Sequence, residues 1–497
     1  MHQRSFAIQS ATIQGVEAIP VLVEVVISNG IPSFSIVGMA DVTIMESRER
    51  VKAALRASGF VMPTDKIVIN LAPGALKKTG SGFDLPIALG ILAATGQIEK
   101  EHISSRLVVG ELLLDGSVRA PKGMLAYQQC AYSQGYNLLT GVSDQGIFNM
   151  EGLTCYALEH LSHIRTGRFA LHKTFAPHEQ QEQVDYAEVI GHEAAKRALQ
   201  VAAAGNHGVL MVGPPGSGKT MLAQRFATIL PELSESEKIE AALVHSVAGE
   251  DISPILLGRR PFRSPHHSAT AAGLIGGGKP PHPGEASLAH RGVLFLDELA
   301  EFKTSVLQTL RQPIETGSIA LTRADGTYVF PAKFQLVAAT NPCPCGYFGD
   351  PSGKCRCGVV AVQAYQNRMG GPLIDRIDMR IDVWREKSDE LFSSGKGRSS
   401  AELREGVERA RAFAKWRSSK RNTASKGLRA LKEACCLDKQ TEDFFLSLAN
   451  SQEMSARSVA KTLLLSRTIA DIAESEQVEK AHIAEAFTLR FGGGLSR

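Results

Sequence analysis

The stretch Gly208-Val-Leu-Met-Val-Gly-Pro-Pro-Gly-Ser-Gly-Lys-Thr220, followed by Met221-Leu-Ala-Gln-Arg-Phe226, decides the fold of this chain. It predicts a buried strand, a glycine-rich turn and a helix, with the pattern G-x-x-x-x-G-K-[ST] joining strand to helix. Glycines let backbone N–H groups wrap a phosphate, and the helix N-terminus adds partial positive charge. We therefore expect a nucleotide-binding site here. The residues that we assign to it are Ile190, Gly191, Gly213, Pro214, Pro215, Gly216, Ser217, Gly218, Lys219 and Thr220.

Two consecutive carboxylates predict the second half of this site. Asp297 and Glu298 directly follow the apolar run Gly292-Val-Leu-Phe-Leu296, and charges at the end of a buried strand are costly unless they have partners. We expect Lys219 to reach the β- and γ-phosphates. We expect Thr220 and Asp297 to hold Mg²⁺, and Glu298 to activate the attacking water. Together the two motifs predict ATP hydrolysis; a purely structural acidic pair is the alternative.

Three further polar residues are candidates for the same reaction. Asn341 ends the next apolar run, Val337-Ala-Ala-Thr-Asn341, where it could position the same water. Arg376 lies between apolar residues and beside two acids in Gly371-Pro-Leu-Ile-Asp-Arg-Ile-Asp378, and Arg457 opens a predicted helix. By chemistry alone, either arginine could form an ordinary ion pair, and that alternative stays open.

Composition is that of an ordinary folded protein. The 497 residues are 43 % hydrophobic, 6 % aromatic and 21 % charged, which excludes collagen, coiled-coil rods and wholesale disorder. Lys and Arg number 55 against 51 acidic residues, a net charge of +4, so a uniform polycation is excluded but a local basic surface is not. No apolar run is long enough to span a membrane. The first five residues carry no signal-peptide core, and we expect a cytoplasmic protein.

The chain length predicts about three domains. Short β-branched runs such as Val21–Ile27 and Lys66–Leu71 alternate with helical stretches such as Glu46–Ser58 near the N-terminus. Apolar strands separated by long helical stretches then predict a parallel α/β sheet covered on both faces. Everything from Glu402 to Phe491 has a helical pattern. The expected divisions are an α+β domain at 1–165, a linker at 166–184, an α/β P-loop core at 185–392 and a helical lid at 393–497.

Three longer motifs accompany the phosphate loop: Arg260-Pro-Phe-Arg-Ser-Pro-His-His267, Gly273-Leu-Ile-Gly-Gly-Gly278 and Pro283-Gly-Glu-Ala-Ser-Leu-Ala-His290. With them the whole chain resembles the YifB/ComM family of magnesium-chelatase-like AAA+ ATPases, and its ComM branch most closely. The resemblance implies a ring motor, expected to be a hexamer. It also implies that Asn341 is sensor 1, Arg376 the arginine finger acting on a neighbouring subunit, and Arg457 the sensor 2 arginine of the lid.

The same resemblance implies a DNA substrate. Members of the ComM branch are expected to move branched DNA by ATP-driven branch migration while transforming DNA is integrated. Two insertions could contact DNA, the loop Gly276–His282 and a predicted hairpin over Gly317–Phe330 with a turn at Asp325-Gly326. Lys279 and Arg323 are the phosphate-contact candidates; the alternative is that both charges are simply solvated.

The N-terminal segment resembles the Lon-protease-type domain, through Gly80-Ser-Gly-Phe-Asp-Leu-Pro86 and Gly110-Glu-Leu-Leu-Leu-Asp-Gly-Ser-Val-Arg119. A working peptidase of this type needs a serine activated by a lysine. Alignment of the two landmarks puts Gly82 at the serine position and Leu125 at the lysine position, with Ser81 and Lys122 close by. We expect a catalytically inactive domain that serves assembly or DNA contact.

Four of the eight cysteines form a cluster, C-x-C…C-x-C, at Cys343, Cys345, Cys355 and Cys357. Four thiolates can close a tetrahedral structural Zn²⁺ site. The alternative is a reduced surface loop that binds nothing.

Two rival functions remain. A metal-chelatase motor subunit would share the ATPase core, but the D-x-S-x-S motif of chelatase partners is missing, since Asp115-Gly-Ser-Val-Arg119 departs from it at the last position. An ATP-dependent protein remodeller or protease is disfavoured by the missing serine–lysine pair.

Overall fold

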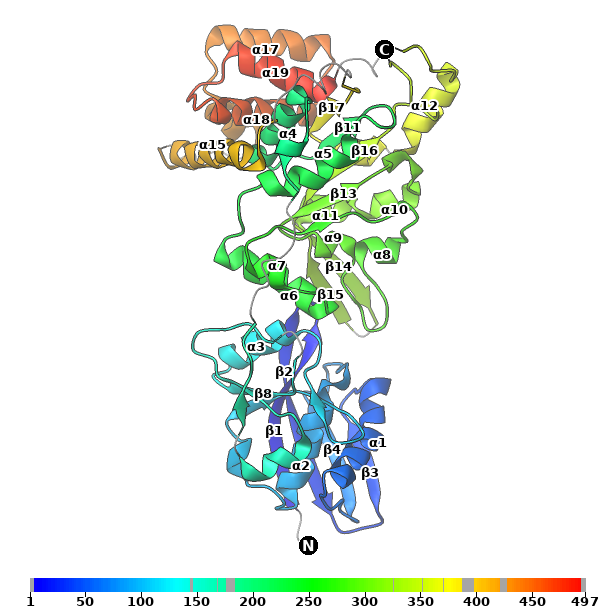
Figure 1. Ribbon diagram of the computed structural model, residues 1–497, viewed down its shortest axis with the longest axis vertical. Helices are drawn as coiled ribbons and strands as arrows, with labels where there is room; N and C mark the ends of the chain where they lie inside the picture. The colour runs from blue at the N-terminus through cyan, green and yellow to red at the C-terminus, as the bar shows by residue number, and fades with distance from the viewer. Residues whose placement is uncertain are drawn as a thin grey trace.

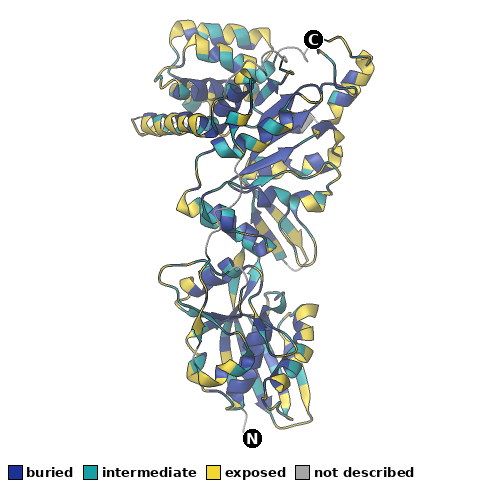
Figure 2. Ribbon diagram, in the orientation of Figure 1, coloured by how far each residue is buried: buried dark blue, intermediate teal, exposed yellow. Residues whose placement is uncertain are grey.

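The chain is a mixed α/β protein drawn out along one axis, with its N-terminal residues at one end (Figure 1). The computed structural model describes residues 4–143, 146–167, 169–175, 184–324, 326–350, 352–369, 371–386, 397–420 and 427–492. Separate apolar cores fill the two ends, and exposed residues follow the outer helices (Figure 2). Within the described residues, no helix is both long and apolar enough to cross a bilayer.

An eight-stranded mixed sheet forms the N-terminal end, in the order β10-β9-β8-β5-β1-β2-β4-β3. At its centre, β1 (Arg4–Gln14) and β2 (Glu17–Ser28) pair antiparallel along their whole length. Alternate residues of β2 from Val21 to Ile27 are buried, as the two-residue period of a strand predicts. The other strands are β3 (Ser33–Val37), β4 (Lys66–Ala72), β5 (Arg106–Val108), β8 (Asn137–Thr140), β9 (Cys155–Ala157) and β10 (Ala170–Leu171), with β6 (Glu111–Leu112) and β7 (Val118–Arg119) as a separate pair.

Three helices pack in this end: α1 (Val42–Ala57), α2 (Asp84–Ala94) and α3 (Met124–Ser133). Every residue of α2 is buried. The helix predicted to begin at Glu46 begins at Val42, because the Asp41 side chain caps it by accepting the N–H of Ile44 at 2.9 Å.

The first part of the predicted linker belongs to the sheet instead. Ala170 in β10 pairs with Ala157 in β9, and Thr174 bridges Ile147. A strand of two exposed residues is held by its distant partners and leaves no periodic signal. Residues 168 and 176–183 of the predicted linker lie outside the described residues, as do residues 387–396 at the predicted break before the lid.

A five-stranded parallel sheet carries the phosphate loop, in the order β12-β13-β16-β11-β17. Its strands are β11 (Val209–Val212), β12 (Phe262–Arg263), β13 (Val293–Leu296), β16 (Gln335–Thr340) and β17 (Met379–Asp382). All residues of β11, β13 and β16 are buried, as expected for a parallel sheet with both faces covered. The surrounding helices are α4 (Glu193–Gly205), α5 (Lys219–Phe226), α10 (Thr304–Thr309), α11 (Arg311–Thr316), α12 (Val359–Arg368) and α13 (Gly371–Ile374). The predicted parallel α/β sheet is confirmed.

Several insertions extend from this sheet toward the N-terminal end (Figure 1). They are α6 (Glu235–Ala248), α7 (Ser253–Leu256), α8 (Ala271–Ile275), α9 (Glu285–Leu288) and the hairpin β14 (Ser318–Arg323) with β15 (Gly326–Pro331). Helix α3 packs on α6, where Leu125 joins Ala241 and Ala242 in one apolar cluster. The Gln14 amide donates to the Thr327 carbonyl at 3.4 Å, so the hairpin also touches the turn between β1 and β2.

The C-terminal part is helical where it is described: α15 (Ser400–Lys420), α16 (Leu428–Cys435), α17 (Lys439–Ser451), α18 (Ala456–Ile472) and α19 (Lys480–Phe491). Helix α15 projects from the body of the molecule (Figure 1). A buried ion pair between Arg417 and Asp471, with both contacts at 3.0 Å, joins it to α18. The predicted helical region is confirmed for the described residues.

Candidate nucleotide-binding site

The phosphate loop lies between the buried strand β11 and helix α5. Gly216 and Gly218 have φ values of 74° and 84°, a backbone region that favours glycine. Lys219 is 8 % exposed, and its ammonium donates to the carbonyls of Gly213 at 2.8 Å and Pro214 at 2.9 Å. Burial lowers the pKa of this ammonium. The amine is therefore held inside the loop, where it can exchange these carbonyls for phosphate oxygens.

The polar residues predicted to share this site do lie together. The Thr220 hydroxyl donates to a carboxylate oxygen of Asp297 at 2.7 Å, and the Asn341 amide oxygen lies 3.4 Å from the Lys219 ammonium. These residues lie close together because β11 and β13 both pair in parallel with β16, so that all three strands end at the same edge of the sheet. A hydroxyl and a carboxylate at this spacing fit the oxygen ligands that Mg²⁺ prefers.

Glu298 has a histidine partner that the sequence motifs did not predict. Its backbone is left-handed, with φ 51°, and its side chain is 57 % exposed. His267 Nδ1 lies 3.2 Å from its carboxylate. The His267 ring in turn lies 4.0 Å, centroid to centroid, from that of His266. The only signal for this contact was the motif ending in His266-His267, which by itself gives no spatial partner.

Gly191 lies next to the phosphate loop. Its φ is 71°, and a side chain there would meet the Glu386 carboxylate, which accepts the His192 N–H at 2.5 Å. The His192 ring lies 3.2 Å from where a side chain would begin at Gly218. Ile190 precedes this turn and is half-buried. His192 and Glu386 are thus part of the surroundings of the loop, and neither was predicted.

Arg376 and Arg457 lie at the opposite, amino edge of the sheet. Arg376 precedes β17, whose first residue Met379 pairs with Val209 at the start of β11, whereas the phosphate loop follows the end of β11. Both arginines face Glu315 of α11: Arg376 hydrogen-bonds its carboxylate, and Arg457 lies 3.7 Å from it. The structure therefore does not bring these two arginines together with the phosphate loop of the same chain.

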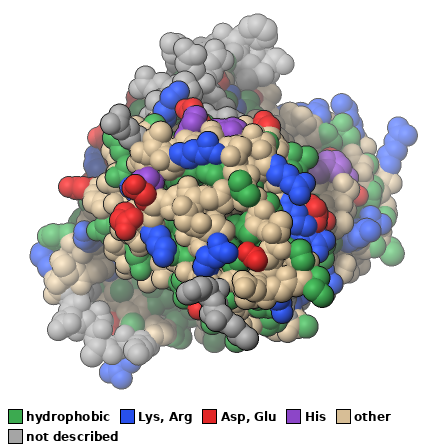
Figure 3. Space-filling view, turned by 90° about the horizontal axis from the view of Figure 1, so that it is seen from below, with side chains coloured by type: hydrophobic (Ala, Val, Ile, Leu, Met, Phe, Trp, Pro, Cys, Tyr) green, Lys and Arg blue, Asp and Glu red, His purple; other side chains and the backbone are tan. Residues whose placement is uncertain are grey.

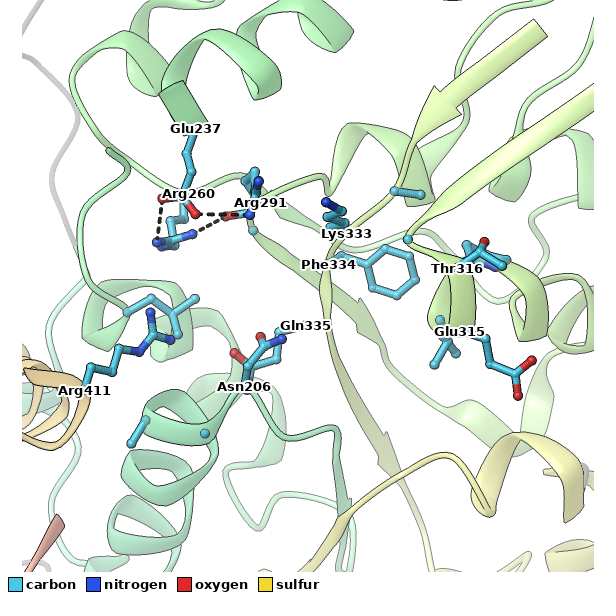
Figure 4. Close-up of a pocket in the computed structure, with 18 residues that line it drawn as sticks. Asn206, Glu237, Arg260, Arg291, Glu315, Thr316, Lys333, Phe334, Gln335 and Arg411 are labelled. Carbon is cyan, nitrogen blue, oxygen red and sulfur yellow. Dashed lines mark hydrogen bonds and ion pairs between the residues drawn. The ribbon is translucent and has the colours of Figure 1, made fainter. Parts of the chain in front are cut away.

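Glu315 lines a cavity of about 650 Å³ at this amino edge of the sheet (Figure 4). Arg260, Arg291 and Arg411 line the far part of the cavity. Glu237 pairs with Arg260 at 3.5 Å and with Arg291 at 3.2 Å. The cavity is therefore partly charge-neutralised by its own residues, and we assign it no ligand.

The two candidate DNA contacts come from neighbouring loops. Gly277 and His282 bridge the ends of the loop that carries Lys279. A side chain at Gly277 would begin 3.9 Å from the Arg323 guanidinium. Arg323 pairs with Gly326 across the predicted hairpin, whose turn residue Asp325 lies outside the described residues.

The residues at or near the predicted serine and lysine positions of a Lon-type peptidase each have a different neighbour. The Ser81 hydroxyl donates to the Glu111 carboxylate, and a side chain at Gly82 would meet Pro121. Leu125 is 1 % exposed in the apolar cluster under α6. The methylenes of Lys122 face Gly249, at the end of that helix.

The four clustered cysteines converge. Their sulfur atoms all lie within 4.8 Å of one another. Cys343 is buried, and the other three are half-buried.

Comparison with known proteins gives matches along nearly the whole chain. The family described as magnesium chelatase, subunit ChlI, matches residues 185–391, a second ChlI family matches residues 23–140, and the ChlI C-terminal family matches residues 397–490. The protein YifB of Salmonella typhimurium is 38 % identical over 96 % of this chain and 95 % of its own. Competence protein ComM of Haemophilus influenzae is 39 % identical over 97 % of each chain. The magnesium-chelatase 67 kDa subunit of Chlorobaculum parvum is 27 % identical over 32 % of this chain and 23 % of its own. Full-length relatives and three consecutive family matches thus agree: the chain belongs to the YifB/ComM family of magnesium-chelatase-like AAA+ ATPases.

Proposed function

We propose that this chain is a subunit of a ring-forming ATPase that moves branched DNA, a branch-migration helicase acting on recombination intermediates during natural transformation. The observation that carries the proposal is that residues expected to share one reaction lie at two opposite edges of one sheet. Lys219 and Asp297 lie at the carboxyl edge and Arg376 at the amino edge. A subunit arranged in this way needs a neighbour to complete its site. The similarity to a protein named for competence supports the biological setting.

The proposed hydrolysis uses the residues at the carboxyl edge. Lys219 transfers its hydrogen bonds from loop carbonyls to the β- and γ-phosphates of ATP. Thr220 and Asp297 would hold Mg²⁺, which would neutralise negative charge on the phosphates. Glu298 orients and activates the water, and Asn341 positions it as sensor 1. These are the catalytic and cofactor roles of this edge.

The opposite edge supplies its arginines to the neighbouring subunit. We expect the two subunits to belong to a hexameric ring. Arg376 is the arginine finger, and Arg457 is the sensor 2 arginine from the helical lid. Within the subunit, Glu315 accepts a hydrogen bond from Arg376 and lies 3.7 Å from the Arg457 guanidinium. An arginine finger supplied in this way stabilises charge in the transition state, so hydrolysis depends on assembly.

DNA contact is assigned to Lys279 and Arg323 on their adjacent loops. A ring repeats each loop once per subunit, so two cations per chain give a dense basic lining despite a net charge of +4. By contrast, the surface seen from the N-terminal end mixes Lys and Arg with Asp, Glu and apolar side chains (Figure 3). This contrast favours the insertions over that end as the DNA contact.

The test is the ATPase rate with single-stranded, duplex and branched DNA, together with strand exchange on a three-stranded junction. At least one DNA is expected to stimulate hydrolysis, and the junction is expected to move. The double variant Lys279→Ala/Arg323→Ala should bind DNA more weakly, with a salt slope smaller by roughly one per lost phosphate contact. The double variant Arg429→Ala/Lys439→Ala, on exposed lid residues, is the matched control. Movement of no DNA junction would remove the proposal.

A second candidate is a motor subunit of a metal chelatase, which the ChlI family matches favour. An ATPase rate that no DNA changes would support it. The proposal that residues 1–165 form a catalytically inactive Lon-protease-like domain is tested by a casein degradation assay with ATP, in which we expect no cleavage.

The remaining parts of the proposal concern organisation and cofactors. We place the ATPase core at 185–392 and the lid at 393–497, with a linker that begins only after β10, and we expect the protein in the cytoplasm. Its cofactors are ATP and Mg²⁺ at the phosphate loop, with a structural Zn²⁺ at the four cysteines.

A further inference from the structure

The four cysteines have the geometry of a closed zinc site. Cys343 Sγ lies 3.4 Å from Cys345 Sγ and 3.8 Å from Cys355 Sγ, and the last two sulfurs are 3.6 Å apart. A tetrahedron with Zn–S bonds of about 2.3 Å has S···S edges of about 3.8 Å. A disulfide would need about 2.05 Å. The spacing therefore fits four ligands of one ion and excludes a disulfide among Cys343, Cys345 and Cys355.

Residues 352–360 form an arm that carries the second cysteine pair and buries few other side chains. Among residues 352–360, every residue except Cys355 and Cys357 is exposed. An arm without apolar anchors gains no burial energy to offset the entropy of ordering it. Ion binding can supply that energy, because a structural zinc site contributes directly to folding.

The turn that begins at the first cysteine pair approaches the phosphate loop at Gly346. Gly346 closes a turn by donating its N–H to the Cys343 carbonyl at 2.9 Å. Its φ is +83°, and a side chain there would begin 2.5 Å from Pro215 Cδ and 3.8 Å from Asn341 Cγ. Only a glycine allows this approach. The cysteine turn thus forms one wall of the phosphate loop and of sensor 1.

An arginine adds a second link between the two loops. Arg385, just after β17, donates from Nε to the Pro215 carbonyl at 3.1 Å and from Nη2 at 2.5 Å. The same guanidinium lies 5.7 Å from the centre of the Tyr347 ring, within the range of a cation–π contact. Tyr347 is two residues beyond Cys345, so displacement of the cysteine turn would also disturb this arginine.

We propose that Cys343, Cys345, Cys355 and Cys357 bind one Zn²⁺ with no open position, and that this ion supports the phosphate loop in its nucleotide-binding shape. The inference rests on the nucleotide site of the proposed function, but it is independent of DNA. Loss of zinc frees the arm, loosens the turn at Gly346 and weakens nucleotide binding. By linkage, bound nucleotide strengthens zinc binding by the same factor, which we expect to be about 5- to 150-fold.

The first experiment measures zinc and nucleotide binding on the full-length protein. Purified protein should contain about one zinc per chain, as four-thiolate structural sites do. A zinc-selective chelator that leaves Mg²⁺ in place should weaken the binding of a fluorescent ATP analogue, and added zinc should restore it. Cys355→Ser should lose both zinc and affinity. Cys436→Ser, in a half-exposed cysteine at the end of α16, should keep both.

The second experiment separates the ion from the contact. Gly346→Ala should keep zinc but lose nucleotide affinity, because the new methyl group displaces Pro215. Gly358→Ala is the matched control, since this glycine has φ −69° and nothing within 4 Å of a new side chain. If a variant fails to fold, wild-type protein gives the answer, because zinc should leave more slowly and bind more tightly when a non-hydrolysable ATP analogue is present.

Each result decides one part of the inference. Zinc well below one per chain in protein purified without chelator would overturn the metal site. A full zinc content with the same nucleotide affinity before and after chelation would overturn the coupling. Neither result bears on DNA stimulation of the ATPase, so this inference and the proposed motor function can fail separately.

Discussion

Replacement of Arg376 offers the sharpest test of the divided site. Arg376→Ala should bind ATP normally and lose turnover by about a thousandfold or more, as removal of an arginine finger does. Lys219→Ala should lose turnover because it cannot hold the phosphates. Each variant alone is therefore inactive, although for different reasons.

The structure predicts that the two inactive variants rescue each other. Val209 to Val212 pair with Met379 to Asp382, so the two edges of the sheet are at least about 10 Å apart at ~3.3 Å per residue. No hydrogen bond spans that distance, so Arg376 does not reach the phosphate loop of its own chain, and the proposed arginine finger has to serve the loop of another subunit. In a ring assembled from equal amounts of both variants, about one quarter of the interfaces then combine an intact loop with an intact arginine.

The assay is ATP turnover of rings assembled by co-expression of the two differently tagged variants. About a quarter of the wild-type rate is expected if interfaces act independently. The control is Arg376→Ala co-assembled with the double variant Lys219→Ala/Arg376→Ala, in which no interface is complete and no activity should return. Mixed rings of the two single variants that stay as inactive as the control would refute the reasoning.

Three further predictions concern other contacts. Asp378→Asn should destabilise the protein by about 3 kcal/mol in urea unfolding, because Lys461 of the lid lies 2.8 Å from this carboxylate. Burial raises the pKa of Asp378, but the hydrogen bond with His207 and the charge of Lys461 outweigh burial and leave the pKa at about 2. The contribution of Asp378 to stability is therefore complete above about pH 4 and lost as the pH falls from there to 2. Leu125→Ala should lower the urea midpoint by the equivalent of about 2–5 kcal/mol, because it opens a cavity between α3 and α6. His267→Ala should raise DNA-independent ATP turnover by no more than about fivefold, because it releases Glu298 from an exposed contact worth at most about 1 kcal/mol. A loss of turnover would show instead that His267 positions the carboxylate.

The nucleotide motif could be predicted because its geometry is local. Gly213 to Thr220 form a loop between one strand and one helix, and eight consecutive residues specify both the backbone shape and the chemistry. The same holds for the parallel strands, whose apolar runs indicate burial on both faces. The short strand β10 was missed because its two residues are held by β9, and pairing with a distant strand leaves no pattern in the residues themselves.

The sequence by itself determined the chemistry of this protein: a phosphate loop, an acidic pair, two arginines and four cysteines. Only the tertiary structure decided where these groups meet. Strand register put Arg376 on the edge opposite the phosphate loop, and packing put Leu125 into an interface with α6. The turn after the first cysteine pair brought Gly346 against Pro215. The physical reason is that residue types fix which bonds are possible, whereas strand order and close packing between distant segments fix which of them form.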